Sequence, residues 1–163
     1  MTHGEQTWKN NARRLAIILD RRIPDLSGPW DDEPDHVEFE AHGFPCVIRR
    51  HVSFGTLCGY VGVREDHPLF AQGKRGCPLP AHGGVTWAGR GRRANLANGL
   101  WWFGFDTCHA WDLVPGFLGT GLLEHFANDK CVYRDLAYCR RECEQMAEAL
   151  SKIKAEEAHA ENN

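Results

Sequence analysis

The sequence predicts a single α+β domain in which an antiparallel or mixed sheet is flanked by an N-terminal helix and a long C-terminal helix. Three observations lead to this class. The 163 residues suit one hydrophobic core, helical apolar periodicity occurs near both ends, and short strand-like runs separated by turn residues fill the middle. We assign residues 1–155 to this domain and residues 156–163 to a frayed acidic tail.

Helical periodicity marks residues 5–22 and 130–153. The first stretch repeats apolar residues on one face, at Trp8, Ala12, Leu15, Ala16 and Leu19, and Pro24 ends it. The second is expected to begin after Asn128 or Asp129 as N-cap. Its apolar positions follow spacings of three and four, at Leu136, Cys139, Cys143, Met146, Leu150 and Ile153. The two cysteines of this seam are expected to pack as small hydrophobic side chains.

The middle of the chain carries strand patterns. We expect strands over residues 36–41, 45–52, 56–63, 84–89 and 100–106. A short helix is expected over residues 122–126. The glycine-rich strand–helix signature of a dinucleotide fold does not occur in the sequence.

The overall charge argues against long nucleic acids as partners. Lys and Arg number 19 against 22 Asp and Glu, for a formal net charge of −3. No apolar run is long enough to span a membrane and no signal-peptide pattern begins the chain, so we expect a cytoplasmic protein. The seven cysteines lack a Cys-x-x-Cys pair and are expected to be thiols, with a structural zinc site as the less favoured alternative.

The charges are segregated along the chain. Six acidic residues lie between Asp31 and Glu40, whereas no Asp or Glu occurs in the 39 residues from His67 to Phe105. This acid-free stretch contains Arg90, Arg92 and Arg93 among many glycines, a composition that suits a site for phosphate or carboxylate oxygens. The alternatives are a solvated arginine loop and a contact to a nucleic-acid backbone.

Two short motifs carry candidate catalytic residues. His82 precedes a glycine pair that opens a strand, and Asp106 ends an apolar strand, with His109 and Asp112 three and six residues later. The two histidines could exchange protons at a substrate while the aspartates orient them. A divalent metal held by the same four residues is the alternative, although we assign no metal. The structural alternative is that Asp106 caps the turn and His109 is a packed polar residue.

Aromatic residues surround both motifs and supply further candidate ligand contacts. We assign Thr86, Trp87 and Trp102 to the ligand, because a tryptophan could stack on a base. Trp101 and Trp102 are consecutive and must face opposite sides of a strand, so one of the two is expected in the core.

These motifs also carry a resemblance. Six segments resemble a widespread family of small bacteriophage and prophage proteins, namely Pro29–Asp35, Cys58–Val63, His67–Leu69, His82–Gly89, Gly104–His109 and Tyr133–Tyr138. The family patterns are HGG-[VL]-T-[YW]-x-G and GFD-x-x-H, and the match extends over roughly residues 29 to 150. The resemblance implies a phage accessory protein made in the bacterial cytosol. By analogy with other small phage proteins, it suggests a counter-defence factor acting on nucleotide second messengers.

Together these features predict a protein that recognises a small phosphorylated, nucleotide-like molecule, such as a cyclic nucleotide. If the protein is an enzyme, we expect a phosphodiesterase-type hydrolase. The alternatives are a sponge that sequesters the nucleotide and an inhibitor that binds a host protein through the acidic residues 31–40. A homo-oligomer is compatible with the sequence.

Overall fold

The computed structural model describes residues 3–118, 121 and 130–160. It contains a five-stranded sheet with an N-terminal helix α1 (His3–Ile18) and a long C-terminal helix α3 (Leu136–Ala160), which confirms the α+β class. The helix expected over residues 122–126 and the N-cap expected at Asn128 or Asp129 lie outside the described residues. No helix in the described part of the chain is long and apolar enough to cross a membrane.

The sheet is antiparallel throughout. Its strands are β1 (His36–Ala41), β2 (Phe44–Arg50), β3 (Leu57–Val63), β4 (Trp87–Arg90) and β5 (Trp101–Asp106). They lie in the order β1-β2-β3-β5-β4, with β5 between β3 and β4. The start of β3 therefore lies beside the end of β5, where Cys58 is opposite Asp106.

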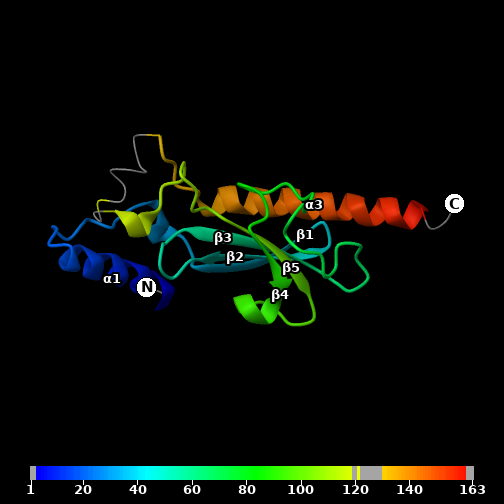
Figure 1. Cartoon of the computed structure of the whole chain (residues 1–163), viewed down its shortest axis with the longest axis horizontal. Coiled ribbons are helices and arrows are strands. Elements are labelled where there is room, and N and C mark those ends of the chain that lie inside the picture. The colour runs from blue at the N-terminus through cyan, green and yellow to red at the C-terminus, as the bar shows by residue number, and fades with distance from the viewer. Residues whose placement is uncertain (1–2, 119–120, 122–129, 161–163) are drawn as a thin grey trace.

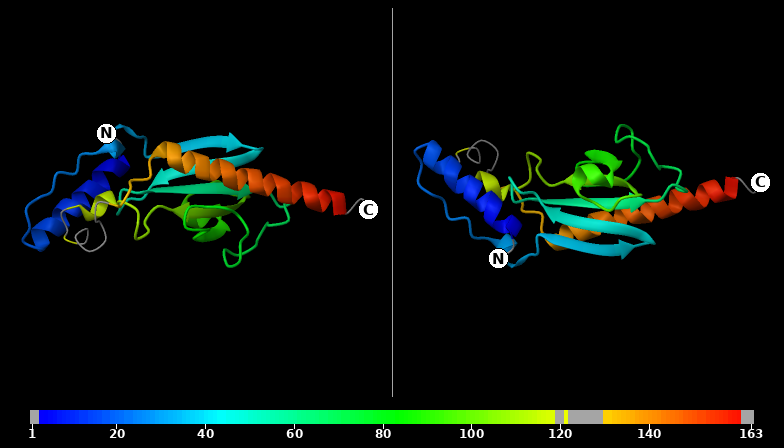
Figure 2. Two further views of the ribbon diagram at one scale, coloured as in Figure 1. Left: turned by 90° about the horizontal axis from the view of Figure 1, so that it is seen from above. Right: turned by 90° about the horizontal axis from the view of Figure 1, so that it is seen from below.

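Helix α3 packs along one face of the sheet and extends beyond it (Figures 1 and 2). The predicted seam is confirmed, because Cys139, Cys143, Met146 and Leu150 are fully buried against the strands. Gly59 on β3 allows this approach, since a Cβ there would lie 2.8 Å from the sulfur of Cys143. Burial raises the pKa of the core thiols, to about 12 for Cys46. These cysteines behave as hydrophobic core residues.

The helix boundaries differ from the sequence expectation at both ends of the chain. Helix α1 ends at Ile18, because Asp20 adopts a left-handed conformation, and Leu19 is exposed rather than buried. Helix α3 begins only at Leu136, where Asp135 accepts a hydrogen bond from the N–H of Tyr138. At its other end it continues through Ala160, so the described part of the expected acidic tail is helical.

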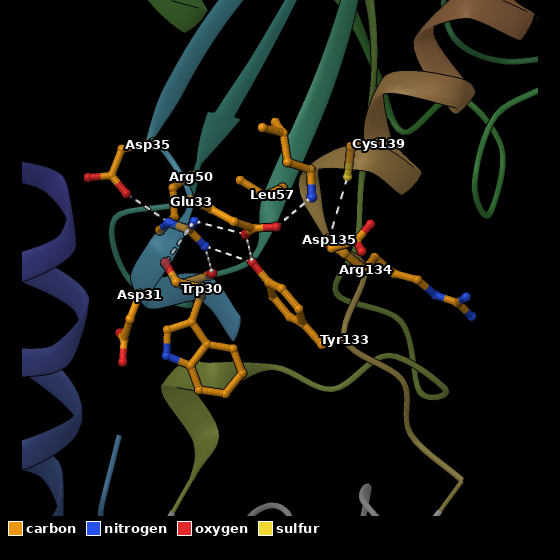
Figure 3. Close-up of polar contacts among 12 residues, drawn as sticks. Trp30, Asp31, Glu33, Asp35, Arg50, Leu57, Tyr133, Arg134, Asp135 and Cys139 are labelled. Atoms are coloured by element: carbon orange, nitrogen blue, oxygen red, sulfur yellow. Dashed lines mark hydrogen bonds and ion pairs between the residues drawn. The ribbon is translucent and has the colours of Figure 1, made fainter. Parts of the chain in front are cut away.

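A buried arginine connects the N-terminal half of the molecule to the start of α3 (Figure 3). The side chain of Arg50 is 1% exposed and donates to Asp35 (2.7 Å) and Glu33 (3.2 Å). It also donates to the hydroxyl of Tyr133 and to the carbonyl oxygen of Gly55, each at 2.9 Å. These contacts satisfy a charge that would be costly to bury alone.

Glu33 extends this network to α3. Its Oε2 atom accepts from the hydroxyl of Tyr133 at 2.5 Å, and its Oε1 atom accepts from the first helical N–H, that of Leu136, at 2.7 Å. A carboxylate at this position also interacts favourably with the helix dipole. Two of the acidic residues between positions 31 and 40 are thus internal structural groups.

Replacing Arg50 by Ala should destabilise the fold by about 3–5 kcal/mol, because the substitution leaves the largely buried carboxylates of Glu33 and Asp35 without their cation. Urea unfolding of the variant measures this loss. The matched control is Lys152→Ala, which removes an exposed pair with Glu148 and should change stability by at most about 0.5 kcal/mol. Equal stability of the two variants would show that the Arg50 network contributes nothing specific.

Candidate acid–base site

The structure brings three of the four predicted catalytic residues together around the buried carboxylate of Asp112. The Oδ2 atom of Asp112 lies 2.8 Å from Nε2 of His82 and 3.2 Å from Nδ1 of His109. The backbone N–H of His109 donates to the same oxygen at 3.0 Å. The side chain of Asp112 is completely buried, that of His82 is 5% exposed and that of His109 is 20% exposed. We call these three residues the His–Asp–His cluster.

Local backbone structure holds Asp112 in this position. The chain turns after β5, so that the N–H of Asp112 donates to the carbonyl of His109 at 2.9 Å. Asp112 then pairs with Val132 in an isolated bridge, and the neighbouring N–H of Leu113 donates to the carbonyl of Val132 at 3.0 Å. The segment that leads into α3 therefore fixes the backbone that carries the Asp112 carboxylate.

Two residues absent from the sequence prediction complete the site. Arg134 donates from Nε to Oδ1 of Asp112 at 3.0 Å, and the hydroxyl of Tyr138 lies 2.8 Å from Nδ1 of His82. The guanidinium of Arg134 also lies over the ring of Tyr138, 4.7 Å from its centroid. The only sequence signal for either residue was their place in the segment 133–138 that supports the family resemblance.

Asp112 is a carboxylate at neutral pH. Burial raises its pKa, but the hydrogen bonds from His82, the N–H of His109 and Arg134 outweigh burial and leave the pKa below the usual value. A carboxylate only accepts hydrogen bonds, so the imidazole nitrogens that face it carry hydrogens. These are Nε2 of His82 and Nδ1 of His109.

The two histidines consequently have different chemical roles. In the neutral ring of His82, Nδ1 accepts the hydrogen of the Tyr138 hydroxyl, so both nitrogens are occupied. In the neutral ring of His109, the remaining nitrogen, Nε2, has an unshared electron pair, and it receives no hydrogen bond from any described residue. An aspartate that fixes the tautomer of a histidine and leaves Nε2 available is the arrangement that general-base catalysis requires.

Gly83 and Trp111 form the surroundings of His109. A Cβ on Gly83 would lie 2.2 Å from Nε2 of His109, so the backbone passes directly beside the available nitrogen. Gly83 also has a φ of +65°, which favours glycine. The Trp111 ring lies parallel to that of His109 at a centroid distance of 5.0 Å, and Trp111 is 51% exposed. This tryptophan presents an exposed aromatic surface at the site.

The fourth predicted catalytic residue lies outside the cluster. Asp106 accepts a hydrogen bond from the N–H of Cys108 at 3.1 Å, which is the turn-capping role considered as its structural alternative. It is also absent from the described group of three residues whose ligand atoms, within 4.8 Å of one another, could hold a metal, namely His82, His109 and Asp112.

The contacts of the cluster favour protons over a metal ion. The Oδ1 atom of Asp112 is paired with Arg134. Its Oδ2 atom contacts Nε2 of His82, Nδ1 of His109 and the backbone N–H of His109. A cation bound here would lie close to the Arg134 guanidinium and would have to displace the ring hydrogens. The three residues can therefore supply metal ligands only at an electrostatic cost.

The predicted ligand residues are separated from the cluster. Arg90 pairs with Trp101 at the start of β5, whereas the cluster follows the end of that strand. Arg92 is exposed in the turn after β4, and the position of Arg93 in the same 3₁₀ helix is likewise beyond Arg90. Arg134 takes the place beside the histidines that the arginine-rich stretch was expected to fill.

The other predicted ligand contacts belong to the sheet. Trp102 is 1% exposed and donates to the carbonyl of Ala97 at 3.1 Å, so it is the core member of the tryptophan pair. Trp87 contacts Tyr60 edge to face on the side of the sheet opposite α3. The N–H of Thr86 donates to Gly104 in the continuation of the β4–β5 pairing. Of the tryptophans, Trp111 is the one stacked on a cluster histidine.

No protein-family model, curated protein or solved structure matches this chain. The candidate site is therefore defined by its own geometry.

Asp112→Asn should destabilise the protein at pH 7 by about 3 kcal/mol, because the substitution leaves Arg134 without its counter-charge. Since the folded-state pKa of Asp112 is depressed, its contribution to stability is present above the pKa of an unfolded Asp, about 3.9, and is lost as the pH falls through the lower folded value. Urea unfolding from pH 7 to pH 2 should show the difference between wild type and variant shrinking below about pH 4. A difference independent of pH would contradict an ionised Asp112.

Gly83→Ala should disturb the site through two effects. The new methyl group would collide with Nε2 of His109, and the φ of +65° would strain an alanine. We expect a destabilisation of about 1–2 kcal/mol and a displaced His109 ring, measurable as changes in the imidazole NMR signals.

The matched control for this substitution is Gly84→Ala. Gly84 has a φ of +88°, so an alanine there is strained in the same way, but its methyl group would have no described atom within 4 Å apart from its chain neighbours. Identical imidazole signals in both variants would contradict close contact between Gly83 and His109.

Proposed function

We propose that the protein binds a small phosphorylated, nucleotide-like molecule beside the His–Asp–His cluster and hydrolyses its phosphate ester with His109 as general base. The observation that carries the proposal is the hydrogen bonding of Asp112, which orients His109 so that Nε2 is left available. The surrounding residues supply the other two requirements, a cation for the phosphate and an aromatic surface for the base.

Arg134 is the proposed phosphate contact. Only its Nε is bonded to Asp112 in the described structure, which leaves the two terminal nitrogens as donors. The side chain is 23% exposed, so these donors are within reach of a ligand. A guanidinium matches the geometry of phosphate oxygens and keeps its charge at all physiological pH values. A second guanidinium, that of Arg141, lies 5.7 Å from the ring centroid of Tyr138 and adds positive charge to the same region.

The proposed reaction is a transfer of the phosphoryl group to water. Nε2 of His109 takes a proton from the water as its oxygen bonds to phosphorus, and the imidazolium is stabilised by the carboxylate of Asp112. The bond between phosphorus and the leaving oxygen breaks, and this oxygen receives the proton. Tyr138 and His82 hold Asp112 in place and do not touch the substrate.

Trp111 gives the proposal its nucleotide character. Its ring is half exposed while it stacks on His109, so the exposed part of the ring can contact a base. Stacking on a tryptophan tolerates any base, which makes the phosphate and the His109 contact the more selective elements. The phage resemblance suggests the class of molecule, a nucleotide signal of host defence.

The acidic residues 31–40 support the alternative inhibitor less well. Glu33 and Asp35 are bonded to the buried Arg50, and Asp31 is paired with Lys9. Only part of the acidic charge therefore faces outward to a basic partner.

The test is to incubate the pure protein with a panel of cyclic dinucleotides, cyclic trinucleotides and cyclic ADP-ribose isomers, followed by chromatography before and after heat denaturation. We expect one class to be converted into hydrolysed product. His109→Ala should lower the rate by at least about 100-fold, the usual contribution of a general base, while chelation of metals should leave the rate unchanged. His42→Asn is the matched control, because His42 is exposed on a turn with a φ of +50° that asparagine tolerates.

The outcomes separate the hypotheses. A nucleotide that is bound but released intact on heating would replace hydrolysis by sequestration. If every nucleotide stays free and intact, the proposal is wrong. A rate abolished by chelation would show that the reaction depends on a metal ion rather than on proton transfer to His109.

A further inference from the structure

The arginine-rich stretch of the sequence leads to a cavity on the face of the sheet opposite α3. After Arg92, the chain turns at Asn95, which has a left-handed φ of +53°. The carbonyl oxygen of Asn95 accepts a hydrogen bond from Nη1 of Arg49 at 3.3 Å. This contact connects the 91–95 turn to β2 and bounds a cavity of about 450 Å³, which Arg49 and Asn95 line together with His51 and Tyr60.

This cavity is distinct from the His–Asp–His cluster. Along β2, Cys46 and Ile48 face α3, so the alternating residues Val47 and Arg49 face the other side of the sheet. On β3, Tyr60 packs against the buried apolar cluster of that same face, opposite α3. The cluster, by contrast, contacts α3 through Tyr138.

Arg49 contributes a positively charged guanidinium to this cavity, where it contacts a carbonyl oxygen and an aromatic ring. Its guanidinium lies 5.6 Å from the ring centroid of Tyr60, and one of its nitrogens is bonded to Asn95. The neighbouring Arg50 is fully engaged by its carboxylates, carbonyl groups and Tyr133. Among the described residues that line the cavity, Asp35 is the one carboxylate, and Arg50 holds it at 2.7 Å. Arg49 therefore determines the charge that the cavity offers to a ligand.

His51 adds a second donor of fixed orientation. Its Nδ1 accepts the N–H of Ser53 at 3.2 Å, so in the neutral ring the hydrogen lies on Nε2. The ring is stacked on Phe54 at a centroid distance of 4.6 Å, which restrains its orientation. Burial lowers the pKa of His51 and outweighs the opposing charge of Asp106, so the neutral ring is the form present at pH 7.

We propose that Arg49 and His51 form an anion-binding site that takes the phosphate group of a small molecule at the cavity on the face of the sheet opposite α3. The guanidinium supplies the charge and a forked set of donors, and His51, which lines the same cavity, supplies a neutral N–H. Tyr60 forms an aromatic wall, supported edge to face by Trp87 at 5.9 Å, against which the organic part of the ligand can pack. This site is independent of the hydrolysis proposed for the cluster.

The test is an NMR titration of the ¹⁵N-labelled protein with inorganic pyrophosphate at low ionic strength. We expect saturable shifts at the amides of Arg49, His51 and Asn95, and weaker binding as salt is added. Arg49→Gln should weaken this binding at least tenfold. Arg14→Gln, which removes an exposed positive charge on α1, is the matched control and should leave the binding unchanged.

Three results would overturn the proposal. These are no shifts at millimolar pyrophosphate, shifts confined to residues of the His–Asp–His cluster, and equal binding by wild type and Arg49→Gln. If Arg49→Gln fails to fold, His51→Gln decides, since it removes the fixed donor and should weaken binding several-fold. Because shifts are assigned residue by residue, failure here leaves the hydrolysis proposal untouched, and the reverse also holds.

Discussion

The burial of the Arg50 guanidinium is the constraint on which the arrangement of this molecule depends. A buried cation must be surrounded by acceptors, and here they come from three separate parts of the chain, namely residues 33–35, Gly55 and Tyr133. All three parts lie outside the strands, so the guanidinium fixes segments that sheet pairing alone would leave independent. Glu33, which is bonded to Arg50, also accepts the first N–H of α3 and so fixes the start of that helix.

The candidate site inherits its geometry from this constraint through three consecutive residues. Tyr133 bonds to Arg50, Arg134 bonds to Asp112, and Asp135 caps the first turn of α3. Because Arg134 lies between the bonded residues Tyr133 and Asp135, its backbone is restrained from both sides. The same first turn of α3 places the hydroxyl of Tyr138 on His82. A positioned carboxylate is therefore a consequence of how α3 begins.

The sequence was sufficient for the elements whose patterns are local. The apolar seam of α3 and the strand runs follow from the periodicity of adjacent residues. The structure confirms the seam and places five strands in the predicted order along the chain, although β4 begins at Trp87 rather than at residue 84. The start of α3 could not be predicted, because residues 130–135 are withdrawn from the helix by partners distant in sequence, such as Asp112. Asp106 and Asp112 illustrate the same limit. Asp106 ends β5 and Asp112 follows six residues later, but the partner of Asp112 is an arginine 22 residues further along the chain.

The acid-free stretch of residues 67–105 does not supply the arginine of the cluster. The cluster needs an ionised carboxylate at its centre, and its arginine comes from the segment before α3, where acidic residues are common. The arginine-rich turn instead continues to Asn95, whose carbonyl oxygen contacts Arg49 on the face of the sheet opposite α3. An acidic residue within the 91–95 turn would lie near the Arg49 guanidinium and would compete with a bound anion. The absence of acidic residues from the 91–95 turn therefore suits anion binding at the cavity beside Arg49, whereas the proposed chemistry of the cluster depends on the carboxylate of Asp112.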